Sequence, residues 1–123
     1  EIGKESVTFY ETIEQFRGFS LLKLTPKTGR THQIRVHLAY IKHPIVADDM
    51  YGGKMVYLWQ LQDAEPAVQE PVIGRVALHA HILEFKHPSN GKMMSFEAPL
   101  PQDMELLLEL LREHRRVKTE DRK

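Results

Sequence analysis

Apolar and polar residues alternate at the start of the chain, as they do in half-buried strands. The alternation runs over residues 6–16, and residues 19–24 are again rich in strand-forming side chains. Because only Arg17-Gly18 lies between these runs, the pattern predicts two adjacent strands joined by a tight turn. Residues 25–30 then predict a loop, and Thr31 is placed to cap a helix that runs to about Ile41.

The predicted helix carries an arginine beside its apolar stripe. Ile34, Leu38 and Ile41 fall on one face and are expected to be buried. Arg35 stands about 60° from Leu38 around the helix axis, at the edge of that stripe. Spacing alone leaves two interpretations open: Arg35 extends past Leu38 into solvent, or its guanidinium enters a semi-buried pocket.

The second half of the chain predicts an irregular stretch, a hairpin and a helix. Residues 55–70 show no clear period and allow at most a short helix. From residue 74 the alternation predicts a strand to residue 85, a turn at 88–91 and a second strand at 92–96. A final helix is predicted from Pro101–Asp103, and its apolar face consists of Met104, Leu107, Leu108 and Leu111. The predicted class is α+β, with a mixed, largely antiparallel sheet and flanking helices.

The length and the charge distribution add to this picture. At 123 residues the chain has the usual size of one domain, and we expect residues 1–114 to form part of that domain and 115–123 to be a charged, frayed tail.

Acidic and basic residues balance at 17 each, so net charge gives no argument for nucleic acid. Between Glu14 and Asp48, however, no acidic residue occurs. The basic residues of that interval, called the basic block below, are Arg17, Lys23, Lys27, Arg30, Arg35 and Lys42.

Composition excludes several other classes. Without cysteine the chain can form neither disulfides nor thiolate metal sites. No apolar run approaches the roughly 20 residues of a membrane span, and the charged first residues do not resemble a secretory signal. We therefore expect a cytoplasmic protein with no membrane partner. The chain begins in strand-like sequence without an initiator Met, so we expect it to be part of something longer.

Histidines raise the question of a metal site. His79 and His81 are two apart on a predicted strand and would share a face, so ligation is geometrically possible. No carboxylate or third histidine lies at a diagnostic spacing. We expect His79 to be hydrogen-bonded in the core and expect no metal site.

The segment 24–38, LTPKTGRTHQIRVHL, resembles the signature of the RluA family of RNA pseudouridine synthases, in which a strand ends in a TGR-T/S-HQ-I/L-R-x-H helix start. Residues 43–48 with Tyr51-Gly52 are similar to the family's G-x-P-I-x-G-D-x-x-Y-G. Two departures occur there: Ala47 replaces the usual glycine, and Lys42-His43 stands where a glycine is common. Residues 75–80, 83–88 and 96–101 resemble the family's closing strands, so the resemblance covers about residues 6–111.

The resemblance implies the pseudouridine synthase catalytic fold and the isomerisation of uridine to pseudouridine in ribosomal or transfer RNA. In the family's reaction an aspartate displaces the uracil from its ribose or assists its departure, and the base rejoins through C5, with no metal or cofactor. The family's R-L-D motif, which carries that nucleophile, and the tyrosine segment after it are absent from this sequence. We therefore expect the C-terminal part of a catalytic domain, inactive alone, whose partners are RNA and the missing N-terminal part.

The resemblance also assigns the site residues. Arg35 matches the family's arginine that pairs with the catalytic carboxylate, a task that suits a permanently charged, bidentate side chain. A glycine, a helix N-terminus and a cation together suit phosphate contacts, although a glycine before a helix is often simple turn chemistry. The expected RNA-binding residues are Thr28, Gly29, Arg30, Thr31, His32 and Gln33. Two other functions stay open: a non-catalytic module that binds structured RNA, and a shared fold whose surface binds a protein.

Overall fold

The computed structural model describes residues 6–29, 31–86 and 88–117. Its elements, in chain order, are β1 (Thr8–Phe16), β2 (Phe19–Pro26), α1 (Gln33–Tyr40), the 3-10 helix η1 (Asp49–Tyr51), α2 (Leu58–Leu61), β3 (Ile82–Lys86), β4 (Met93–Glu97) and α3 (Gln102–His114). The described strands form two separate antiparallel pairs, β1 with β2 and β3 with β4. The predicted α+β class and antiparallel pairing are confirmed.

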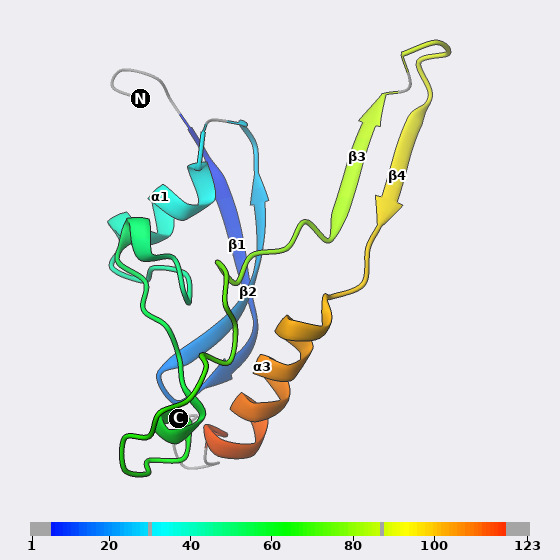
Figure 1. The fold of residues 1–123 in the computed structure, drawn as a ribbon. Coiled ribbons are helices and arrows are strands. Elements are labelled where there is room, and N and C mark those ends of the chain that lie inside the picture. Colours follow the sequence, from blue (N-terminus) through cyan, green and yellow to red (C-terminus); the bar gives the residue numbers. More distant parts are fainter. Residues whose placement is uncertain (1–5, 30, 87, 118–123) are drawn as a thin grey trace.

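The hairpin of β1 and β2 supports the helix of the predicted site. Its two-residue turn uses Gly18 at φ 83°, a conformation that favours glycine. Helix α1 lies beside β1 (Figure 1). His37 fixes this contact, since its two ring nitrogens lie 2.9 Å from the Ser6 hydroxyl and 2.9 Å from the Thr8 hydroxyl. The face of α1 that carries His37 is therefore tied to the first strand.

The hydrophobic core lies on the side of the hairpin where α3 packs. Helix α3 buries the predicted apolar face, and its side chains meet the end of β1, the loop before η1 and α2. The buried cluster consists of Phe16, Ala47, Val56, Leu61, Ile73, Met104, Leu107, Leu108 and Leu111. The predicted final helix, its buried face and the short helix at α2 are confirmed.

Three details of the sequence prediction are wrong. Helix α1 begins one residue later than expected, with His32 rather than Thr31 at the N-cap, in left-handed geometry and without a side-chain cap hydrogen bond. Ile41 is 51% exposed, so the buried stripe is reduced at that end of α1. The strand expected from residue 74 begins only at Ile82. Residues 75–81 have the apolar alternation of a strand, but none of the described strands lies beside them to complete a ladder.

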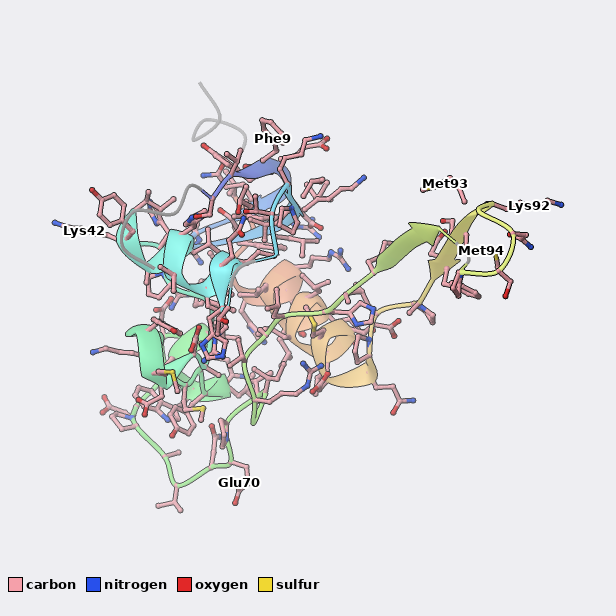
Figure 2. The ribbon with its side chains drawn as sticks, turned by 90° about the horizontal axis from the view of Figure 1, so that it is seen from above. Phe9, Lys42, Glu70, Lys92, Met93 and Met94 are labelled. Atoms are coloured by element: carbon pink, nitrogen blue, oxygen red, sulfur yellow. The ribbon has the colours of Figure 1, made fainter. Side chains whose placement is uncertain are left out.

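The hairpin of β3 and β4 forms an arm that extends from the body (Figure 1). Figure 2 places Lys92, Met93 and Met94 at its far end. The arm is joined to its base by a backbone bond in which the Ala98 amide donates to the His81 carbonyl at 2.8 Å. Because two strands alone are marginally stable in water, we expect this arm to add little stability of its own.

The end of the chain is described as far as Val117. Phe16 forms an isolated antiparallel bridge with Arg116, and the Arg115 side chain donates to the backbone carbonyls of Gln60 and Leu61. The remainder of the predicted tail, residues 118–123, lies outside the described residues. In the part of the chain that the structure describes, no helix is long and apolar enough to cross a membrane.

Candidate active site

An ion pair between Arg35 and Asp48 forms the centre of the candidate site. The Arg35 Nε donates to Asp48 Oδ2 at 2.9 Å, and Nη2 donates to Oδ1 at 2.7 Å, so one carboxylate binds one edge of the guanidinium. The Arg35 side chain is 19% exposed and that of Asp48 is fully buried. Of the two interpretations of Arg35 left open by spacing, the semi-buried one is confirmed.

A closed loop brings Asp48 under α1. The Asp48 amide donates to the Ile45 carbonyl at 3.0 Å, and the Asp48 carbonyl accepts from the Gly53 amide at 2.7 Å. A Cβ at Gly53 would lie 1.9 Å from the Ile45 carbonyl oxygen and 2.9 Å from the Asp48 nitrogen. This distance is far below van der Waals contact, so the loop closes only because residue 53 is glycine.

Lys42 and Ala47, which stand where the family commonly has glycine, both adopt left-handed backbone geometry. Lys42, two residues after the last residue of α1, has φ 66°, and Ala47, just before Asp48, has φ 64°. These conformations cost an ordinary residue roughly 1 kcal/mol, which a glycine avoids. The loop therefore keeps a shape suited to glycine although side chains are present at both positions.

Tyr51 and His32 complete the surroundings of Arg35. The guanidinium carbon of Arg35 lies 5.0 Å from the centre of the Tyr51 ring, within the range of a cation–π contact. The Tyr51 hydroxyl is 2.8 Å from His32 Nδ1. His32 itself has φ 51°, a strained geometry for a residue other than glycine. Side chains from α1, η1 and the turn before α1 thus meet around one guanidinium.

Thr28 and Gln33 make hydrogen bonds that hold the fold together. The Gln33 side chain is buried, and its amide nitrogen donates to the Val7 carbonyl at 2.8 Å and approaches the Thr8 hydroxyl at 2.9 Å. Its amide oxygen accepts from the Thr28 hydroxyl. These bonds tie the start of α1 and the loop before it to β1.

The exposed part of the predicted RNA-binding set is smaller than the whole set. Gly29, Thr31 and His32 are exposed, and Arg30 lies outside the described residues. Among the other members of the basic block, Arg17, Lys23, Lys27 and Lys42 are exposed. Lys27 lies in the loop before α1, whereas Arg17 is in the turn between β1 and β2, where its Nη2 donates to the His114 carbonyl at 2.9 Å, and Lys42 follows the other end of α1. The surface before α1 therefore offers exposed polar groups and the Lys27 cation to an anionic ligand.

The ion pair keeps its charges over a wide pH range. Hydrogen bonds from Arg35 lower the pKa of Asp48; burial acts in the opposite direction, and the positive charge of Arg35 adds to the lowering. The same hydrogen bonds raise the pKa of Arg35. Both groups are therefore ionised at neutral pH.

Asp48 is the partner of Arg35 that the sequence alone did not reveal. The chain contains a signal, because Asp48 is the first acidic residue after Glu14 and so the first carboxylate to follow the basic block. Asp48 also stands at the aspartate of the family's G-D motif, but nothing in the spacing indicates that the intervening loop folds back beneath α1.

The histidines form no metal site among the residues that the structure describes, where no group of three or more histidines and carboxylates could hold an ion. The hydrogen bond expected of His79 is confirmed, since its Nε2 lies 3.1 Å from the Ala98 carbonyl oxygen, but its expected place in the core is wrong, because His79 is only partly buried and lies outside the core cluster. His81 Nδ1 lies 2.7 Å from the same oxygen.

Comparison with known proteins gives the family. A family model described as RNA pseudouridylate synthase matches residues 1–40. The chain is 45% identical over 112 residues to an uncharacterized RNA pseudouridine synthase of Chlorobaculum parvum, a match that covers 89% of this chain and 34% of the relative. It is 40% identical over 122 residues to ribosomal large subunit pseudouridine synthase D of Vibrio cholerae, covering 98% of this chain and 37% of that protein.

The Escherichia coli protein of the same name is 44% identical over 111 residues, covering 90% of this chain and 34% of that protein. The chain thus spans about a third of the length of the curated relatives it matches. The family model covers the motif around Arg35, the relatives match most of this chain at 40–45% identity, and this chain belongs to the RluA-type family of RNA pseudouridine synthases.

Proposed function

We propose that this chain supplies the arginine of an active centre that isomerises uridine to pseudouridine in the RNA of the large ribosomal subunit. The observation that carries the proposal is the semi-buried Arg35 fork, which lies in the family's signature motif and has an edge that Asp48 does not occupy. Names of the relatives support the choice of RNA.

The nucleophilic aspartate would come from a part that this chain does not contain. The chain spans about a third of its relatives, and the family's R-L-D motif is not in it. Large apolar side chains on β1 are open to solvent, with Phe9 55% and Ile13 53% exposed. We propose that an N-terminal part of the same catalytic domain covers these side chains and brings its carboxylate to Arg35.

RNA would be bound by the basic block and the exposed residues before α1. Phosphate contacts release counterions, so affinity should fall as salt rises. Lys27→Ala and Arg30→Ala should each weaken binding of a ribosomal RNA hairpin and reduce the salt slope by about one contact. Lys92→Ala is the matched control, because Lys92 lies at the far end of the arm (Figure 2).

Tritium release from RNA labelled at C5 of uridine tests the proposal. The chain alone should release none, whereas a chimera in which it replaces the matching segment of the Escherichia coli relative should be active. Turnover by the chain alone would overturn the need for a second part. An inactive, folded chimera that still binds RNA with salt dependence would favour the alternative, a non-catalytic module for structured RNA.

A further inference from the structure

The guanidinium of Arg35 has two edges, and Asp48 occupies only one. A guanidinium carries five N–H donors, and Asp48 accepts one from Nε and one from Nη2, which leaves two on Nη1 and one on Nη2. No described residue other than Asp48 accepts a hydrogen bond from Arg35. The end of the guanidinium, formed by Nη1 and Nη2, can therefore bind a second anion while the side edge stays bound.

The occupied edge is rigidly held. Asp48 is fully buried, and backbone bonds of the closed loop fix its position on both sides. Tyr51 lies against the face of the guanidinium and is itself in contact with His32. A side chain bound at one edge and one face has few rotamers left, so its free end points in one direction.

We propose that Asp48 is a positioning residue for the reaction: it binds the side edge of the Arg35 guanidinium so that the free end meets the carboxylate of the nucleophile. The Tyr51 ring, which lies against the guanidinium, supports the same orientation. This inference rests on the proposed function. In this arrangement the buried Asp48 carboxylate acts on the reaction only through Arg35.

The placement of a catalytic group within a fraction of an ångström governs rate more than binding. Loss of Asp48 should therefore slow the chemical step while RNA affinity, which depends on the basic block, stays unchanged. A purely structural role would predict a different result: RNA affinity and the rate of the chemical step would fall together as the folded fraction falls.

The test compares Asp48→Asn with Asp49→Asn. Asparagine keeps the shape of the carboxylate but loses its charge, and Asp49 is its exposed neighbour in the chain. In the chimera, single-turnover rate at saturating RNA should fall at least about tenfold for Asp48→Asn, with RNA affinity and melting temperature measured alongside. Asp49→Asn should react at the normal rate. A normal rate for Asp48→Asn would overturn the proposal.

A measurement on the 123-residue chain separates this inference from the proposed function. Nuclear magnetic resonance of the Arg35 Nε–H group should give a slowly exchanging signal that is lost in Asp48→Asn and kept in Asp49→Asn. An unchanged signal in Asp48→Asn would overturn the positioning role whatever the chimera does. A lost signal with an inactive, unsubstituted chimera would instead overturn the proposed function, and the role of Asp48 in catalysis with it.

Tyr51 gives a second pair of variants in case Asp48→Asn does not fold. Tyr51→Phe keeps the ring against the guanidinium, whereas Tyr51→Leu removes it and leaves the ion pair intact. The leucine variant should react more slowly than the phenylalanine variant at saturating RNA. Equal rates in the two variants would show that the Tyr51 ring does not help to orient the Arg35 guanidinium.

Discussion

Two ion pairs of this chain have nearly the same geometry and different surroundings. In both Arg35–Asp48 and Arg75–Asp103 the arginine Nε lies 2.9 Å from an aspartate Oδ2, and the Nη2 to Oδ1 distances are 2.7 Å and 2.9 Å. The side chains of the second pair are 43% and 37% exposed, against 19% and 0% for the first. The fork by itself therefore does not identify a functional site.

The two arginines differ at the end of the guanidinium that the aspartate does not bind. Nη1 of Arg75 donates to the backbone carbonyls of Val76 and Leu78, both at 3.1 Å, so this arginine fastens the segment before the arm to α3. The end of Arg35 makes no such bond to a described residue and stays available. An arginine with both edges occupied is a structural tie, and one with a single edge occupied can bind a ligand.

The largest effect is expected where the loop that buries Asp48 is forced open. Gly53→Ala would place a methyl carbon on the Ile45 carbonyl oxygen and close to the Asp48 nitrogen. Both are backbone atoms, so the backbone itself has to shift. We expect a loss of about 3 kcal/mol in the free energy of unfolding, the upper end for overpacking. Urea denaturation measures it. Gly29→Ala is the control, because a Cβ at Gly29 would have no atom within 4 Å; an equal loss there would contradict this account.

The two pairs themselves should differ in stability when one charge is removed. Asp48→Asn leaves a partly buried guanidinium without its counter-charge, and we expect a loss of about 2 kcal/mol. Asp103→Asn should cost less than about a third of that loss, because exposed pairs are well solvated when broken. Equal losses in urea denaturation would mean that burial does not distinguish the two pairs.

Acid should lower the free energy of unfolding of the unsubstituted chain, in part by protonating Asp48 and Asp103. Hydrogen bonds from arginine lower the pKa of Asp48 and of Asp103 in the folded chain. The unfolded chain then binds protons more readily, so the contribution is present above about pH 4 and is lost as pH falls through the lowered folded values. Urea midpoints should therefore fall as pH drops below about 5, where the unfolded carboxylates begin to bind protons, and they should fall less steeply in Asp48→Asn. A parallel fall in both proteins would exclude a contribution from Asp48.

The smallest effect should be a gain. Lys42→Gly relieves the left-handed geometry after α1 without touching either pair, and we expect about 0.5 to 1 kcal/mol of added stability. Lys54→Gly is the control, since Lys54 is exposed but is not at positive φ, and it should destabilise. A loss in Lys42→Gly would show that the lysine side chain compensates for its backbone strain.

The local pattern of apolar and polar residues was sufficient to predict the helices and strands that bury one face against a neighbouring element. Alternation predicted β1 and β2, and the spacing of Met104, Leu107 and Leu111 predicted α3. The same alternation failed at residues 75–81, because a strand needs a partner beside it. There the Ala77 amide donates to the Val46 carbonyl, a single bond to a loop.

The candidate site was only partly predictable. The motif gave Arg35, and its position at the edge of the apolar stripe agrees with its partial burial. Pairing with Asp48 depends on a loop closed by Gly53 and on the left-handed turn at Ala47, which are long-range features that residue spacing does not reveal. The left-handed N-cap at His32 likewise departs from the capping preference that favoured Thr31.

Arg35 itself gives the most direct test of the account. In the chimera with the Escherichia coli relative, Arg35→Ala should lower the single-turnover rate of tritium release at saturating RNA by at least about a hundredfold, with RNA affinity nearly unchanged. Arg35→Lys keeps the charge but loses the planar fork, and should recover only part of the rate. A near-normal rate for Arg35→Ala would show that Arg35 takes no part in the reaction and leave Arg35–Asp48 as a structural pair like Arg75–Asp103.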